Sequence, residues 1–157
     1  MIIDGTLGGG GHSEALLAAG ATVYGIDRDP VALAAATARL QPYGARFHPV
    51  KGEFGELTSL VPQRVHGLLL DLGVSSPQLD VAERGFSFMH DGPLDMRMSD
   101  LGETCAELIA RADEHELADL IYQYGDERFS RRIARALVAA RRESPVDTTG
   151  RLASIVR

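Results

Sequence analysis

Residues 4–13 read DGTLGGGGHS, a run of four glycines that follows a short apolar segment and precedes a helix-like one. Because glycine has no Cβ, a turn built from it lets the backbone come unusually close to a ligand. When such a turn opens a helix, it also offers unpaired N–H donors and the positive end of the helix dipole. The stretch therefore predicts a strand–turn–helix unit that binds a nucleotide-like ligand.

Around this stretch, short apolar runs alternate with helical ones as far as residue 72. This alternation is typical of a parallel sheet in an α/β fold. Strands are expected at residues 1–3, 22–26, 46–50 and 67–72. Helices are expected at residues 13–19, 31–40 and 54–60. Ser13 is expected to cap the first of them, and Asp29 followed by Pro30 to start the second.

The fourth expected strand, residues 67–72, is almost continuously apolar, which is typical of a strand covered on both faces. An apolar strand makes an unfavourable sheet edge, because it invites pairing with other chains. We therefore expect the sheet to be incomplete in this chain, and the chain to be a fragment of a longer protein.

Beyond residue 72 the sequence changes character. Residues 73–102 hold turn formers, charges and few periodic features, and they predict a long loop. Within it, residues 83–98 combine aromatic, arginine and methionine side chains, which either contact bases and phosphates or pack on one another. Helices are expected at residues 104–111, 114–124 and 127–142.

The composition indicates an ordinary globular protein. Of the 157 residues, 45% are hydrophobic, which is enough for one domain with a core. No apolar run is long enough for a membrane span and no signal-peptide pattern is present, so we expect a cytoplasmic protein without a membrane partner. The single cysteine, Cys105, rules out an internal disulfide and is expected to be a small buried thiol. No metal site is expected.

The charge is unevenly distributed. A net charge of −6 disfavours nucleic-acid binding by the molecule as a whole. Residues 128–142, however, carry six arginines and no acidic residue. This segment is either a local basic face for a phosphate backbone or a solvated helix face.

An acidic residue, Asp27, follows the second expected strand, where nucleotide-binding folds place a carboxylate to accept from the two ribose hydroxyls. The dinucleotide fingerprint needs a third glycine, but that position falls on Ser13 or Glu14, and a carboxylate there faces a pyrophosphate badly. S-adenosylmethionine carries no phosphate, and Asp4 suits its ammonium group, directly or through water. The sequence therefore favours S-adenosylmethionine over a nicotinamide cofactor.

Two further side chains close to the expected strand ends each have two interpretations. His12 is a ligand or base, or its backbone amide meets the carboxylate of the cofactor; we favour the amide. Phe54 follows the third strand, where an apolar ring commonly covers the adenine, although a core position fits it almost as well. Both residues are candidate cofactor contacts.

Asp71 ends the fourth strand and Ser75 follows it. Ligands of open α/β sheets bind at the carboxyl ends of the strands. The amine of a nucleobase is a poor nucleophile because its lone pair is delocalised into the ring. Acceptors on its N–H groups would hold it in line for methyl transfer. Asp71 and Ser75 are therefore the candidate catalytic residues, and turn capping is their alternative role.

Five segments together carry a specific resemblance. They are residues 4–13, 25–30, 70–80, 83–98 and 124–129. In these segments the chain resembles the bacterial 16S ribosomal RNA (cytosine-N4)-methyltransferases, and the likeness covers essentially its whole length. It implies a cytoplasmic enzyme that uses S-adenosylmethionine to methylate the N4 amine of a cytidine in the 16S rRNA of the small ribosomal subunit.

The resemblance also implies a Rossmann-like class I methyltransferase sheet with an inserted helical domain. Residues 1–102 would be the N-terminal part of the methyltransferase domain, and residues 103–157 part of the helical insert. Family members begin earlier, continue well past residue 157, and usually carry Glu at the position of Asp126. The chain is therefore expected to be about the N-terminal half of a member.

By the same resemblance, seven residues bind the cofactor: Gly10, Gly11, His12, Asp27, Phe54, Asp71 and Gln78. The first three would contact the methionine part, Asp27 the ribose and Phe54 the adenine, while Asp71 and Gln78 line the same pocket. The alternatives are a nicotinamide-dependent oxidoreductase and a non-catalytic RNA-binding or interaction fragment.

Overall fold

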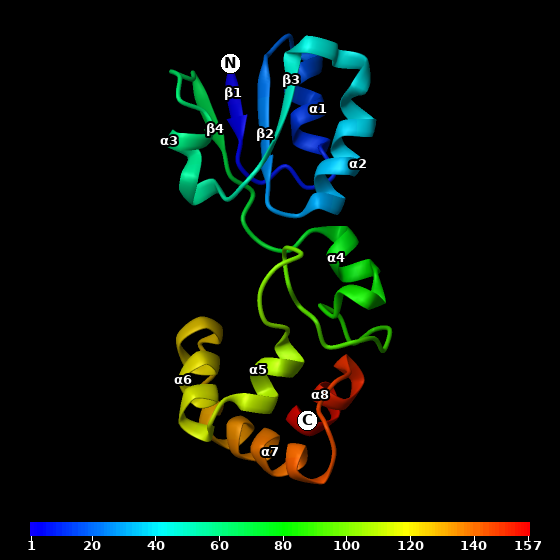
Figure 1. The fold of residues 1–157 in the computed structure, drawn as a ribbon, viewed down its shortest axis with the longest axis vertical. Coiled ribbons are helices and arrows are strands. Elements are labelled where there is room, and N and C mark those ends of the chain that lie inside the picture. Colours follow the sequence, from blue (N-terminus) through cyan, green and yellow to red (C-terminus); the bar gives the residue numbers. More distant parts are fainter. The chain divides into compact units, whose positions relative to one another are not determined.

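The computed structural model describes residues 1–157 and contains two compact units (Figure 1). The first unit consists of Met1–Gly73 with Met98–Asp100, and the second of Val74–Arg97 with Leu101–Arg157. This division falls after residue 73, whereas the predicted boundary between methyltransferase domain and helical insert lies after residue 102. The functional assignment of the residues between these two positions stays a prediction.

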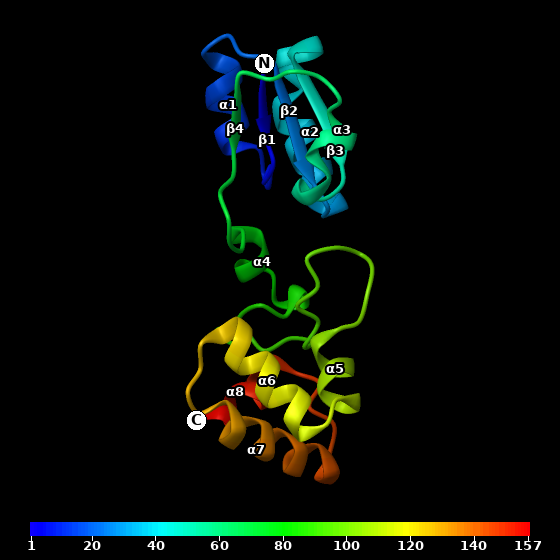
Figure 2. The ribbon, with the colours of Figure 1, turned by 90° about the vertical axis from the view of Figure 1, so that its left-hand side faces the viewer.

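The first unit is built on a four-stranded parallel sheet in the order β3-β2-β1-β4 (Figures 1 and 2). The strands are β1 (Ile2–Asp4), β2 (Val23–Asp27), β3 (Phe47–Lys51) and β4 (Gly67–Leu69). In the register of the sheet, Ile3 of β1 lies between Tyr24 of β2 and Leu68 of β4. The predicted α/β fold class, consistent with a Rossmann-like methyltransferase fold, is confirmed.

Helices pack on both faces of this sheet. They are α1 (Gly11–Ala18), α2 (Pro30–Leu40), η1 (Gln41–Arg46), η2 (Phe54–Glu56) and α3 (Leu57–Leu60). On one face, Leu17 of α1 and Leu40 of α2 pack with Val23 of β2. On the other face, Ile3 and Ile26 form a second cluster with residues of α3. The side chains of β2 thus alternate between two cores, as a pleated strand requires.

The two long helices of the first unit begin differently. Asp29 caps α2 as predicted, because its side chain accepts a hydrogen bond from the Val31 N–H at 2.9 Å and Pro30 takes the first helical position. The prediction that Ser13 caps α1 is wrong. Gly10 occupies the cap position, and Ser13 lies fully buried inside the helix.

The fourth strand departs from its prediction. β4 is only three residues long and lies at the sheet edge, where it pairs with β1 alone. Leu68 is 50% exposed and Leu70 42% exposed, so the expectation of a strand covered on both faces is wrong for residues 1–157. Apolar composition indicates a preference for burial, but burial also needs a neighbouring element, and the first unit provides none at this edge.

The second unit is mainly helical. Its longer helices are α5 (Cys105–Arg111), α6 (Glu114–Gly125), α7 (Ser130–Glu143) and α8 (Thr149–Val156). They share a core of buried side chains: Leu94, Ile109, Ala112, Leu117, Ala118, Ala134, Leu137 and Val146. The three predicted helices are confirmed, although α7 begins three residues late, since Asp126 takes a left-handed conformation that ends α6. Helix α8 has no counterpart in the prediction.

Residues 74–97 belong to the same unit as these helices, and most of them are irregular, as the prediction of a long loop expects. They include α4 (Ser76–Asp80) and η3 (Ala82–Arg84). Leu94 is 2% exposed, and its N–H donates to the carbonyl of Asp147 at 2.8 Å. The segment is held by contacts with distant residues, which leave no periodic pattern in the sequence.

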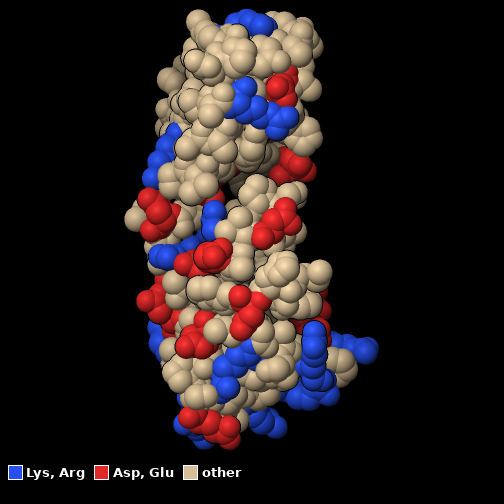
Figure 3. Space-filling model, turned by 90° about the vertical axis from the view of Figure 1, so that its right-hand side faces the viewer, with Lys and Arg blue, Asp and Glu red and all other residues tan.

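Cys105 starts α5 and is partly buried against the same core. Burial raises the pKa of its thiol, because the thiolate loses its hydration. A thiol in this position suits packing better than nucleophilic chemistry, as expected. No helix of the chain has the length and apolar content needed to cross a membrane. Acidic and basic side chains are interspersed over much of the surface shown in Figure 3.

Candidate functional site

The glycine turn leads from the end of β1 into α1, and its glycines have different surroundings. Gly10 has φ +80°, and a Cβ there would lie 3.1 Å from Leu40 Cδ1 and 3.2 Å from Ala36 Cβ. Glycine is therefore needed here both for its conformation and for the close approach of α2. Gly9 and Gly11 are exposed, and a Cβ at Gly9 would meet no atom within 4 Å. The turn thus packs on one side and is open on the other.

The start of α1 offers unpaired donors. The N–H of Gly10 donates to the Leu7 carbonyl at 2.8 Å, and the Gly10 carbonyl accepts from the Glu14 N–H at 2.8 Å. The backbone N–H groups of Gly11 and His12 form no hydrogen bond within the chain. Such groups at a helix N-terminus attract negative charge. Of the predicted methionine contacts, Gly11 and His12 therefore offer their N–H groups, whereas Gly10 shapes the turn.

Asp4 lies beneath this turn. It is fully buried, its Oδ2 accepts from the Ser13 hydroxyl at 2.8 Å, and its Oδ1 accepts from the Thr6 N–H at 3.2 Å. Because Asp4 has no exposed surface, the predicted direct contact with an ammonium group is wrong, while the contact through water stays a prediction. Its carboxylate instead ties the end of β1 to the first turn of α1. The sequence alone does not reveal this, because Ser13 reads as a helix cap.

Asp27 joins the end of β2 to the same turn. Its Oδ2 accepts from the Gly8 N–H at 2.8 Å, and its Oδ1 accepts from the Asp29 N–H at 2.9 Å. A carboxylate has about four lone-pair directions, so both oxygens retain the capacity to accept from a ligand. The structure thus brings Asp27 and the glycine turn together, as the sequence predicts.

His12 and Asp71 also lie close together. The His12 Nδ1 is 3.8 Å from the Asp71 Oδ2, and both side chains are more than half exposed. The Asp71 N–H donates to the Thr6 hydroxyl at 2.7 Å, which fastens the segment after β4 to the glycine turn. Thr6 is a site residue that the sequence reasoning missed, although it lies inside the glycine motif.

Phe54 lies beside the end of β1. A Cβ at Gly5 would be 3.2 Å from the Phe54 Cβ, and the Phe54 side chain is 47% exposed. It belongs to neither core of the first unit, so the alternative of a simple core phenylalanine is wrong. Its predicted contact with an adenine ring stays a prediction.

Glu14, at the position where a dinucleotide site needs glycine, is paired with a cation. The Arg39 Nε and Nη2 donate to the Glu14 Oε2 at 2.9 and 2.6 Å. This pair offsets the negative charge, so the predicted repulsion of a pyrophosphate loses its force. The argument against a nicotinamide cofactor therefore rests on the missing third glycine of the dinucleotide fingerprint.

Ser75 and Gln78 belong to the second unit. Gln78 is buried, and its Oε1 accepts from the Ser75 N–H at 2.8 Å, which caps α4. The alternative role of Ser75 in turn capping thus has direct support. The predicted roles of Gln78 at the cofactor and of Ser75 in catalysis stay predictions.

The arginines of residues 83–98 bond within the second unit. The Arg97 Nε and Nη2 donate to the two Asp95 carboxylate oxygens at 2.8 and 2.7 Å, and Arg84 donates to the Arg97 carbonyl at 3.0 Å. The hydrogen bonds from Arg97 hold the pKa of Asp95 below its ordinary value. These arginines therefore organise the loop, which favours the interpretation of a segment folded on itself.

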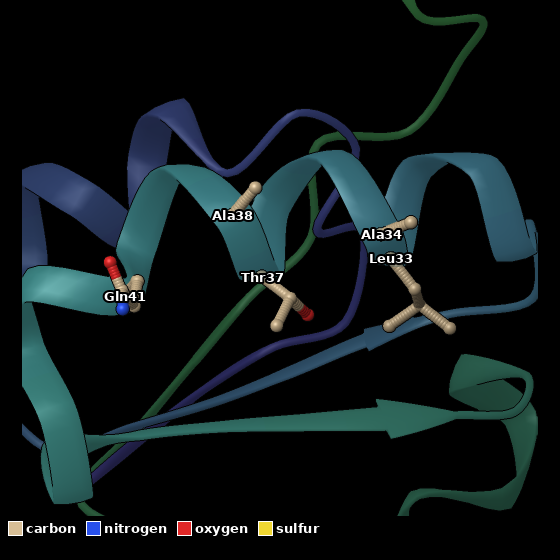
Figure 4. Close-up of a pocket in the computed structure, with 5 residues that line it drawn as sticks. All are labelled: Leu33, Ala34, Thr37, Ala38 and Gln41. Atoms are coloured by element: carbon tan, nitrogen blue, oxygen red, sulfur yellow. The ribbon is translucent and has the colours of Figure 1, made fainter.

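An open pocket elsewhere in the first unit contains none of the predicted site residues (Figure 4). It is lined by Leu33, Ala34, Thr37, Ala38 and Gln41, from α2 and η1. None of these side chains titrates. The candidate site is instead the group of residues at the carboxyl ends of the strands, which is where open α/β sheets bind ligands.

Comparison with known proteins gives the family of the chain. The model of the MraW methylase family matches residues 1–157. A ribosomal RNA small subunit methyltransferase H of Myxococcus xanthus is 65% identical over 144 residues, which are 89% of this chain and 46% of that protein. Proteins of the same name from Anaeromyxobacter sp. (strain K) and Granulibacter bethesdensis are 56% and 50% identical, over 52% and 49% of their own lengths. The chain thus spans about half the length of the curated relatives it matches, and it belongs to the MraW methylase family.

Proposed function

We propose that this chain serves the S-adenosylmethionine-dependent methylation of the N4 amine of a cytidine in the 16S rRNA of the small ribosomal subunit, in the cytoplasm. Membership of a methylase family and the names of the relatives support the reaction class. The observation that carries the proposal is the position of Asp27. The Gly8 N–H holds its carboxylate against the glycine turn, which continues to the unpaired N–H groups of Gly11 and His12.

These residues fit S-adenosylmethionine in their chemistry. The Asp27 carboxylate retains lone pairs that can accept hydrogen bonds from the two ribose hydroxyls. The N–H groups of Gly11 and His12, at the positive end of α1, suit the methionine carboxylate. The exposed ring of Phe54 offers an apolar face for the adenine. Gly10 contributes by letting the turn pack against α2.

Bound S-adenosylmethionine supplies a methyl group on a sulfonium. The contribution of the chain is to hold the acceptor amine, and Asp71 is the best candidate in the first unit. Its backbone is fastened to Thr6, and its exposed carboxylate can accept an N–H of the cytosine amine. An acceptor in this position aligns the nitrogen and stabilises the charge that develops on it. Ser75 is the second candidate for this role, and Gln78 is proposed to line the cofactor pocket.

Titration calorimetry of the 157-residue chain separates this proposal from the oxidoreductase alternative. We expect heat of binding from S-adenosylmethionine and none from NADH at the same concentration, because the turn lacks the third glycine of a pyrophosphate site. Binding of NADH without binding of S-adenosylmethionine would refute the proposal. Binding of RNA without binding of either cofactor would support the alternative of a non-catalytic RNA-binding fragment.

A further inference from the structure

The turn between α6 and α7 presents an exposed aromatic ring between two cations. The Cζ atoms of Arg128 and Arg132 lie 4.7 and 4.6 Å from the centroid of the Phe129 ring. Phe129 is nevertheless 44% exposed. Its backbone N–H donates to the Glu127 carboxylate at 2.7 Å, which fixes the ring at the start of α7.

The cations of this turn form no ion pair within the protein, although Arg128 and Arg132 contact the Phe129 ring. Arg128, Arg131 and Arg132 are exposed, and no carboxylate lies within ion-pair distance of them. Arg135 differs, because it lies 3.3 Å from the Glu114 carboxylate. Arg141 differs too, since it donates to the backbone carbonyls of Ile109 and Ala112 at the C-terminal end of α5. The basic segment 128–142 predicted from the sequence therefore presents arginines without an ion-pair partner mainly at its N-terminal end.

Two more aromatic side chains precede this turn. Tyr122 is 60% exposed and Tyr124 84% exposed, and both belong to the end of α6. Large apolar rings at such exposure are not explained by the core of the unit, whose buried residues lie elsewhere on α6 and α7. Figure 3 shows basic side chains protruding together from the second unit, where the sequence contains arginine but no lysine.

We infer that this surface is a contact site for single-stranded RNA. We call it the α6–α7 corner, and it consists of Tyr122, Tyr124, Arg128, Phe129, Arg131 and Arg132. Unpaired arginines attract phosphates, and exposed aromatic rings stack on unpaired bases in a sequence-tolerant way. Asp126 and Glu127 are the acidic residues of the turn, and the second is engaged with the Phe129 N–H. On a chain of net charge −6, the corner offers an RNA backbone three arginines that form no ion pair.

The inference rests on the proposed function, because it takes RNA as the substrate, and it adds where that RNA is held. The choice of RNA over an acidic protein follows from the combination of groups. Acidic side chains would need only the arginines, whereas the corner also exposes three aromatic rings. Bases supply the flat partners that such rings require.

The test uses the 157-residue chain and a fluorescent single-stranded RNA of about 20 nucleotides, a length chosen to exceed the site sizes of single-strand binders. The variant R128Q/R132Q removes the two arginines that flank Phe129, and R64Q/R142Q removes two exposed arginines outside the corner. We expect the first to weaken binding by about tenfold or more and to reduce the salt slope by about 1.4, for two lost phosphate contacts. The control should bind within about twofold to threefold of the original chain, and matching circular dichroism would show that both variants fold.

The inference fails if R128Q/R132Q binds RNA as tightly as the control R64Q/R142Q does. It also fails if polyglutamate binds the chain as tightly as RNA does. Phe129→Leu gives a second readout, with an expected loss of about five- to tenfold for a lost stacking contact. Calorimetry with S-adenosylmethionine on R128Q/R132Q distinguishes the two proposals. Unchanged cofactor binding with unchanged RNA binding overturns only the corner, whereas absent cofactor binding in the original chain overturns the proposed function.

Discussion

Replacement of Asp27 by alanine is expected to weaken S-adenosylmethionine binding by at least about tenfold, or about 1.4 kcal/mol. The carboxylate at the end of β2 is a partly exposed acceptor held against the glycine turn by a hydrogen bond from Gly8, and it also accepts from Asp29. Its loss would remove the two charge-assisted hydrogen bonds that the proposal assigns to the ribose, and it would remove the contact with the Gly8 N–H that shapes the turn. Titration calorimetry on the 157-residue chain measures the effect.

Two controls make the Asp27 result specific. Asp119→Ala removes an exposed carboxylate of α6 and should leave the affinity unchanged. Asp27→Asn keeps an oxygen that can accept from the Gly8 N–H, so it separates support of the turn from contact with the ribose. An unchanged affinity in Asp27→Ala would remove this residue from the site.

Replacement of Gly85 by alanine is expected to destabilise the second unit by about 3 kcal/mol or more. Gly85 has φ +72°, a region that costs an alanine about 1–2 kcal/mol. Its added Cβ would also overlap the Pro93 carbonyl oxygen and lie 2.6 Å from the Asp95 nitrogen, and neither backbone atom can rotate away. Amide hydrogen exchange in α7 reports the stability of this unit separately from the sheet.

Gly102→Ala is the matched control for Gly85→Ala. Gly102 also has a left-handed φ, +93°, but a Cβ there would meet nothing within 4 Å. Gly102→Ala should lower the free energy of unfolding by only the cost of the left-handed conformation, about 1–2 kcal/mol. Equal losses in the two variants would show that the segment relaxes around Gly85, against the close packing described here.

The parts of the fold that follow from local pattern could be predicted. The strands of the sheet alternate with amphipathic or capped helices, and Asp29-Pro30 starts α2 as such a pair should. Asp27 and Asp71 lie at the strand ends for the same reason, since the carboxyl ends of parallel strands share one edge.

The parts that depend on distant contacts could not be predicted. Asp4 reads as a ligand-binding acid, yet its burial depends on a bond to Ser13 in the following helix. The exposure of Leu68 depends on which element lies beyond β4. The folding of residues 74–97 depends on how Leu94 packs into the helical core. Arg141 looks like its neighbours in sequence, but it donates to backbone carbonyls at the C-terminal end of α5. Sequence spacing reports none of these.

Methyl transfer to RNA tests the proposed function most directly. A chimera would carry residues 1–157 in place of the matching part of the Myxococcus xanthus relative, to which the chain is 65% identical. It would be incubated with methyl-labelled S-adenosylmethionine and small ribosomal subunits that lack the modification, and the 16S rRNA would then be digested to nucleosides. The account predicts labelled N4-methylcytidine, which Asp27→Ala removes. A folded chimera that yields no labelled N4-methylcytidine, while the Myxococcus protein does, would contradict it.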